Sequence, residues 1–209
     1  MREIKAILFD MDGVLIEAKE WHYDALNEAL AMFGCEISLY DHLVTFDGLP
    51  TRDKLKMLTS VGKLPKDLHP IINKMKQKFT ARIIAQKCKP LFTHQYALSK
   101  LKSEGYKMAV CSNSIRKSVE MMMESSGLSK YFDFYVSNED VSKGKPDPEM
   151  YLRAMSNFNL NPDDCLILED NENGIKAAIE SGGNLLRIDE VSDVNYLNIK
   201  CRINELNKN

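Results

Sequence analysis

The chain has 209 residues, of which 44% are hydrophobic and 28% are charged, as in an ordinary globular protein. A chain of this length buries about 70% of the surface that its unfolded form exposes, so it needs no disulfide or structural metal to fold. Its 28 basic and 30 acidic residues leave a formal net charge of −2, which argues against general nucleic-acid binding, because such binding requires a basic face. The composition also excludes disordered and collagen-like chains. We expect one or two domains and a small substrate, if there is one.

The cysteines and the apolar segments predict a soluble, cytoplasmic protein. None of the five cysteines forms a C-x-x-C pair, and thiols scattered in this way suit a reducing compartment. Only four apolar residues run together before Asp10, which is too few for a signal-peptide core. No run approaches the roughly 18 apolar residues of a membrane span. We expect no nucleic acid or membrane as partner, and a monomer or weak homodimer.

Apolar runs of strand length alternate with stretches of helical periodicity along most of the chain. These runs are residues 6–9, 107–111, 134–136, 165–168 and 185–188. Continuous apolar runs are typical of strands buried on both faces, as in a parallel sheet covered by helices. Helical patterns follow several runs and end at glycines such as Gly105, Gly127 and Gly182, which accept the left-handed conformation beyond a helix. The alternation predicts an α/β fold with a doubly wound, mostly parallel sheet.

One region after the first strand, from about residue 20 to residue 87, has helical patterns and no strand-like run. Apolar residues recur at helical spacing in three segments, which are 26–33, about 54–61 and 68–83. The simplest arrangement is an all-helical insertion into the sheet domain. Beyond the last predicted strand, the polar residues 204–209 are expected to be frayed.

The predicted insertion divides the chain into two domains. We expect a Rossmann-like core formed by 1–17 and 90–209, and a helical cap at 18–89. If the protein transfers a group, it must admit substrate at one step and exclude water at another, so we expect the cap to open and close. The linkers near 17–20 and 87–92 are the places for such a hinge.

Acidic residues follow two of the predicted strands at the points where they end. Asp10 and Asp12 come after the first strand, and Glu169 and Asp170 come after the fourth. Ligands of an open parallel sheet bind beyond the carboxyl ends of its strands, so we expect these four carboxylates to converge on one edge. Such charges repel unless a cation offsets them. Oxygen donors without His or Cys favour Mg²⁺ over zinc.

Polar residues of other types accompany these carboxylates. Ser112, Asn113 and Ser114 follow the strand that ends at Cys111, and Lys145 lies in the loop before a predicted helix. Magnesium together with a lysine and a hydroxyl is typical of a site that positions a phosphoryl group and neutralises its charge. The sequence therefore indicates phosphoryl transfer.

The motifs at these strand ends resemble, in order and setting, the four motifs of the haloacid dehalogenase superfamily. They are Phe9-Asp10-Met11-Asp12-Gly13-Val14, Ser112, Lys145 and Glu169-Asp170. Within that superfamily the chain is similar to the beta-phosphoglucomutase-like members, which carry a helical cap after the first strand. The resemblance covers almost the whole chain.

The resemblance implies a reaction in two steps with a covalent intermediate. Asp10 would be the nucleophile that takes the phosphoryl group as an aspartyl phosphate. Asp12 would protonate the leaving oxygen and then activate water as general acid and base. The implied Mg²⁺ ligands are Asp10, the backbone carbonyl of Asp12, and Asp170, with Glu169 as a further ligand or as support for one.

The resemblance also implies how the phosphoryl group is held. Ser112 would hydrogen-bond its oxygens with Asn113 alongside, and Lys145 would neutralise the developing charge. Asp12 argues against dehalogenase chemistry, because the dehalogenases of the superfamily lack both the metal and this second aspartate.

Two features of the expected cap are candidate substrate contacts. The segment Phe46-Asp47-Gly48-Leu49-Pro50-Thr51-Arg52 resembles the substrate-specificity loop of the family. Gly48 would let the backbone approach the substrate, and Arg52 would grip a second phosphate or be solvated at a helix start. His22 matches a position that often faces the active site in related proteins, although it also suits a helix surface.

These motifs support a Mg²⁺-dependent phosphatase of a small phosphorylated metabolite, with a sugar phosphate as the expected substrate. A phosphosugar mutase is the alternative: Arg52 and His22 favour it, whereas Glu17-Ala18 replaces the Asp-Thr often found in mutases. A non-catalytic phospho-acceptor of the receiver type groups similar residues, but receivers are shorter and have no inserted cap.

Overall fold

Five short parallel strands form the centre of the computed structural model, which describes residues 3–46 and 48–208. They are β1 (Ala6–Phe9), β2 (Lys107–Cys111), β3 (Phe134–Val136), β4 (Cys165–Glu169) and β5 (Asn184–Arg187). Their spatial order is β3-β2-β1-β4-β5, and each neighbouring pair is parallel. The prediction of a doubly wound parallel sheet is confirmed.

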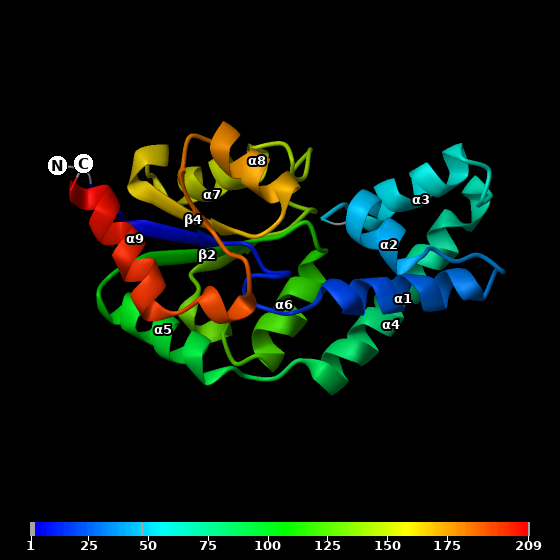
Figure 1. Ribbon diagram of the computed structural model, residues 1–209, viewed down its shortest axis with the longest axis horizontal. Helices are drawn as coiled ribbons and strands as arrows, with labels where there is room; N and C mark the ends of the chain where they lie inside the picture. Colours follow the sequence, from blue (N-terminus) through cyan, green and yellow to red (C-terminus); the bar gives the residue numbers. More distant parts are fainter. Residues whose placement is uncertain (1–2, 47, 209) are drawn as a thin grey trace.

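Both faces of the sheet are covered by helices, which explains why the strands are apolar without interruption (Figure 1). In β1, Ile7 and Phe9 pack into one buried cluster, whereas Ala6 and Leu8 pack into the other. The first face is covered by α5 (Phe92–Ser103), α6 (Arg116–Ser125) and α9 (Tyr196–Lys208). The second face is covered by α7 (Glu149–Phe158) and α8 (Glu172–Glu180). Short turns of helix occur at η3 (Ser129–Tyr131), η4 (Pro162–Asp164) and η5 (Val191–Asp193).

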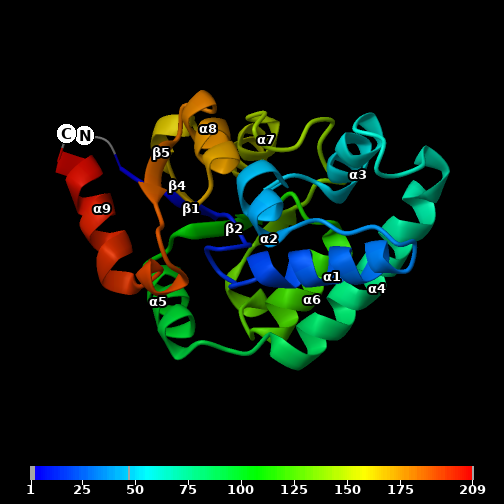
Figure 2. The same cartoon turned by 45° about the vertical axis from the view of Figure 1, so that its right-hand side comes forward.

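A helical insert follows β1 and lies to one side of the sheet (Figure 1). Its elements are α1 (Lys19–Ala31), α2 (Leu39–Asp41), η1 (His42–Phe46), α3 (Thr51–Ser60), η2 (Lys66–Leu68) and α4 (His69–Lys87). Figure 2 shows α1 and α4 side by side. The insert has a hydrophobic cluster of its own, to which Leu26, Leu55 and Ile72 contribute from three different helices. We propose that residues 18–89 therefore act as one cap domain. No helix among 3–46 and 48–208 is both long and apolar enough to cross a membrane.

The prediction that the last residues are frayed is wrong for those that the structure describes. Residues 204–208 are not frayed but form the last turns of α9, and Asn209 lies outside the described residues. Ile199, Ile203 and Leu206 are buried at helical spacing against the sheet. The polar residues between these three face solvent, and their polarity masks a periodic apolar stripe that is only three residues long.

Substitution of Leu8 tests whether β1 lies at the centre of the hydrophobic core. Its side chain is fully buried between the sheet and α7, so Leu8→Ala should lower the free energy of unfolding by about 2–5 kcal/mol. Leu197→Ala on α9, where the leucine is 72% exposed, is the matched control and should change stability by less than about 0.5 kcal/mol. Urea denaturation measures both. Equal losses would contradict this account of the core.

Candidate active site

The register of the central strands brings three carboxylates together at the carboxyl edge of the sheet. Phe9 in β1 is level with Leu168 in β4, so the residues that follow them, Asp10 and Glu169, are neighbours. The backbone N–H of Asp10 donates to the Leu168 carbonyl at 3.0 Å. Carboxylate oxygens of Asp10, Glu169 and Asp170 lie within 4.8 Å of one another.

The Lys145 ammonium lies among these carboxylates. Its Nζ donates to Asp10 Oδ1 at 2.5 Å, to Glu169 Oε1 at 2.6 Å and to the Cys111 carbonyl at 2.7 Å. Only 3% of the Lys145 side chain is exposed. Burial disfavours its charged form, but the two carboxylates outweigh this effect and raise the pKa of Lys145 above its usual value. The lysine therefore stays charged.

Burial raises the pKa of the two carboxylates that bind Lys145, because it disfavours their charged forms. It raises the pKa of Asp10 well above the usual range, and it raises the pKa of Glu169, in both cases only partly offset by Lys145. The Tyr151 hydroxyl also donates to Glu169. A Cβ at Gly174 would overlap the Glu169 carboxylate, so the glycine allows α8 to pack against it. The cluster thus has an excess of buried negative charge, which a cation would lower.

Asp12 lines the same cavity as Asp10, but its carboxylate is not part of this cluster of three. Its carboxylate accepts a hydrogen bond from Ser114 Oγ at 3.1 Å and lies 3.5 Å from Ser112 Oγ. On its other side, Asp12 Oδ1 is 2.9 Å from His22 Nε2 of the insert. The chain bends at Met11, between the two aspartates, and turns again at Gly13, whose φ is +94°, so Asp12 does not continue the line of the strand.

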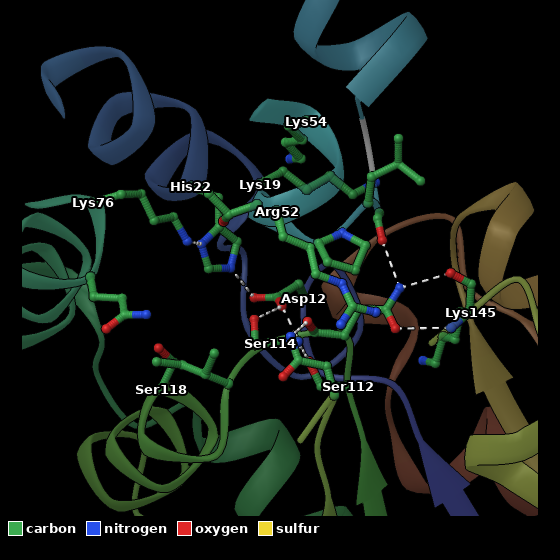
Figure 3. A pocket seen from close by; sticks show the side chains of 18 of the residues that line it. Asp12, Lys19, His22, Arg52, Lys54, Lys76, Ser112, Ser114, Ser118 and Lys145 are labelled. Atoms are coloured by element: carbon green, nitrogen blue, oxygen red, sulfur yellow. Dashed lines mark hydrogen bonds and ion pairs between the residues drawn. The ribbon is translucent and has the colours of Figure 1, made fainter. Parts of the chain in front are cut away.

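His22 links Asp12 to a lysine that the sequence analysis did not single out. Lys76 Nζ lies 3.1 Å from His22 Nδ1, which gives the series Asp12, His22, Lys76 across the cavity (Figure 3). A charged lysine can only donate, so Nδ1 accepts and Nε2 carries the proton that is donated to Asp12. Burial opposes the charge of Asp12, but His22 and Ser114 outweigh it and lower the pKa of Asp12.

The same burial favours the neutral forms of the two cap residues. Burial and the charge of Lys76 lower the pKa of His22, although Asp12 partly offsets them. Burial and the nearby Lys54 lower the pKa of Lys76 to about 8. The sequence holds a signal for Lys76: it lies on α4 one turn after the buried Ile72, on the face that packs inward.

The remaining predicted residues lie where the insert meets the core. The Asn113 side chain donates to the Gly48 carbonyl at 2.8 Å and to the Lys145 carbonyl at 3.0 Å. It also accepts from the Lys145 backbone N–H at 2.9 Å. Both of its N–H groups are therefore used, so its amide reaches a phosphoryl oxygen only if the Gly48 loop moves. Asp47 of this loop lies outside the described residues.

A cavity of about 540 Å³ separates the insert from the sheet. The core lines it with Asp10, Asp12 and Ser112, and the insert lines it with cationic side chains. These are Lys19, Arg52, Lys54 and Lys76. Arg52 is largely exposed and lies 3.6 Å from Asp53, whereas Lys54 is buried. The arrangement suits an anionic ligand that meets the acidic groups of the core at one end and the cations of the insert at the other.

The carboxylate cluster has the donors of a hard divalent cation. All its donors are oxygens, as Mg²⁺ prefers. Asp170 Oδ2 is buried and, within the described part of the chain, has no hydrogen-bond donor in acceptable geometry. A buried acceptor without a directed hydrogen bond is unfavourable unless a positive charge meets it. The Lys19 ammonium supplies such a charge at 2.7 Å, and a divalent cation bound to the same oxygens would supply one too, so the residues present fit a metal ion here.

Comparison with known proteins agrees with this geometry. A model of the haloacid dehalogenase-like hydrolases matches residues 7–188. The chain belongs to this family. It is 27% identical over 179 residues to a phosphorylated carbohydrates phosphatase of Thermotoga maritima, covering 86% of this chain and 82% of that one.

Solved structures show the same fold. A beta-phosphoglucomutase from Clostridium difficile superposes with a TM-score of 0.84 at 21% identity, covering 99% of this chain and 100% of that one. CbbY from Rhodobacter sphaeroides, solved in complex with xylulose-(1,5)bisphosphate, has a TM-score of 0.81 at 23% identity over 88% of this chain and 85% of that one. The family resemblance inferred from the motifs is confirmed.

The buried charge of Lys76 should lower the stability of the folded protein. Lys76→Met removes a desolvated charge and should raise the free energy of unfolding at pH 7 by on the order of 1–3 kcal/mol, because a tenfold change in proton affinity corresponds to about 1.4 kcal/mol. The pKa of Lys76 is about 8 in the folded protein and lies below its ordinary value of 10.5. Between these pH values the unfolded state binds the proton and the folded state does not, so the free energy of unfolding of the wild type rises with pH. The difference in stability between Lys76→Met and the wild type should therefore shrink.

Urea denaturation across this pH range measures the effect. Lys78→Met, an exposed lysine on the same helix, is the control and should change stability by less than about 0.5 kcal/mol at any pH. A loss of stability in Lys76→Met at pH 7 would mean that the lysine is a net stabiliser of the cap.

Proposed function

We propose that this protein is a Mg²⁺-dependent phosphatase that hydrolyses a small phosphorylated sugar through an aspartyl phosphate on Asp10. Family membership and the Thermotoga relative together support a phosphatase of phosphorylated small molecules. The observation that carries the proposal is the contrast between Asp10 and Asp12. One is held in the carboxylate cluster by Lys145, and the other is held by a histidine of the cap.

This contrast suits the two roles that the reaction needs. In the first step an Asp10 oxygen bonds to phosphorus and the bond from phosphorus to the sugar oxygen breaks. The leaving oxygen takes the proton that Asp12 carries before this step, and the hydrogen bond from His22 stabilises the Asp12 carboxylate that results. In the second step water attacks phosphorus, its proton passes to Asp12, and the bond from phosphorus to Asp10 breaks, which releases phosphate.

Mg²⁺ would be held by Asp10, Asp170 and the backbone carbonyl of Asp12, with Glu169 as a ligand or as support for one. When bound, it supplies positive charge that shields the phosphoryl group from the carboxylates. Lys145 would supply the second positive charge. Its contacts with Asp10 and Glu169 support this role.

The substrate would lie in the cavity between cap and core. Ser112 at the end of β2 would bind the phosphoryl oxygens, with Asn113 released to join it when the Gly48 loop moves. Arg52 and His22 would face the remainder of the substrate. The cations of the cap support an anionic or strongly polar substrate, and relatives that act on phosphorylated carbohydrates or bind a sugar bisphosphate support a sugar.

A panel of sugar phosphates with Mg²⁺ tests the proposal. At least one should release inorganic phosphate, and chelation by EDTA should abolish the release until Mg²⁺ is restored. Asp10→Asn should lower kcat by about a thousandfold or more, because it removes the nucleophile. Asp53→Asn on the exposed cap surface is the control and should retain activity. Release by Asp10→Asn at the wild-type rate would contradict the assignment of Asp10.

A phosphosugar mutase is the second candidate, and the series Asp12, His22, Lys76 favours it. This series places a proton relay on the cap side of Asp12, where a sugar hydroxyl rather than water would be activated. The similarity to a beta-phosphoglucomutase fold is consistent with both reactions.

The two reactions differ in what they release. With glucose 1-phosphate and a bisphosphate primer, a mutase forms glucose 6-phosphate without net release of inorganic phosphate. The proposed phosphatase instead releases one inorganic phosphate for each free sugar that it forms. We expect the second result. Isomerisation that outpaces phosphate release would establish the mutase.

A further inference from the structure

Lys19 reaches from the cap to a carboxylate of the candidate metal site. It is the first residue of α1, and its Nζ lies 2.7 Å from Oδ2 of Asp170, which follows β4 in the core. The Asp170 side chain is 2% exposed and that of Lys19 is 31% exposed. The contact is an ion pair without directed hydrogen-bond geometry, since Oδ2 has no such donor among residues 3–46 and 48–208.

The backbone between the two domains is shaped to allow this contact. A Cβ at Gly13 would overlap the Asp170 carboxylate and lie 2.8 Å from Lys19 Cε. Gly13 also has a φ of +94°, which side-chain-bearing residues rarely adopt. The glycine therefore leaves the space through which the lysine chain passes to Asp170, so this ion pair is a feature built into the site.

We propose that Lys19 sets the affinity of the site for its divalent cation, because the lysine and the cation draw on the same Asp170 carboxylate. The inference rests on the Mg²⁺ site of the proposed function. A cation that binds Oδ2 must replace the ammonium, and a cation that binds Oδ1 must share the carboxylate with it. In both cases like charges meet in a buried site, so Lys19 weakens metal binding.

The location of Lys19 connects metal binding to the cap. The same helix, α1, carries His22, whose contact with Asp12 is another link between cap and core. A cation that takes over Asp170 removes the Lys19 link and leaves the ammonium at the wall of the substrate cavity. Lys19 is therefore a positioning residue for metal and cap, distinct from the residues proposed to carry the reaction.

Magnesium binding by the full-length protein tests the inference without any substrate. Titration calorimetry with Mg²⁺ should give a Kd for Lys19→Met that is lower than that of the wild type by roughly fivefold or more. Lys19→Gln, which removes the charge but keeps a polar group, should change the Kd in the same direction. Lys56→Met removes an exposed lysine that pairs with Asp53 on the cap surface and should leave the Kd unchanged.

Thermal unfolding gives an independent readout. The increase in Tm between EDTA and saturating Mg²⁺ should be larger for both Lys19 variants than for the wild type and Lys56→Met. If the wild type binds Mg²⁺ and both Lys19 variants bind it equally or more weakly, the inference is overturned and the proposed function stands. If the wild type binds no Mg²⁺, the metal site of the proposed function fails, and the inference fails with it.

Discussion

The site depends on one buried ammonium between carboxylates of adjacent strands. Lys145 bonds to Asp10 beyond β1 and to Glu169 at the end of β4, and it also binds the last carbonyl of β2. Without this charge, the parallel register that makes Asp10 and Glu169 neighbours would place like charges together in a buried position. The strand order therefore brings negative charges together, and Lys145 in the loop before α7 neutralises part of that charge. The negative charge that remains makes the cluster suited to a cation.

Core and cap are electrostatically complementary. The core presents Asp10, Asp12 and Asp170 at its edge, whereas the insert presents Lys19 and Lys76. Contacts between the two units include an ion pair, the bond from His22 to Asp12 and a bond from the core to the cap loop. Burying charge between domains is costly unless partners are present. The cavity thus favours a ligand whose negative charge faces the cap and whose reacting group faces the sheet.

Two aspartates separated by one residue have different environments because the chain turns between them. Asp10 continues the line of β1, and burial raises its pKa. Asp12 lies beyond the strand next to His22, which lowers its pKa. Pairs of titratable groups whose environments separate their pKa values are characteristic of sites that use one group as nucleophile and the other for proton transfer. The difference between the two environments comes from the bend at Met11 together with a histidine from the helical insert.

The sequence by itself determined the sheet, because strands buried on both faces leave uninterrupted apolar runs, and it placed Asp10, Ser112 and Glu169 at the strand ends. It did not show α9, whose short apolar stripe lies among polar residues. Only the tertiary structure decided that Asp12 leaves the carboxylate cluster and that Lys19 and Lys76 enter the site. Those contacts join residues that are distant in the chain, between the helical insert and the core. Local periodicity indicates which face of a helix is buried, but it does not indicate which core residues that face meets.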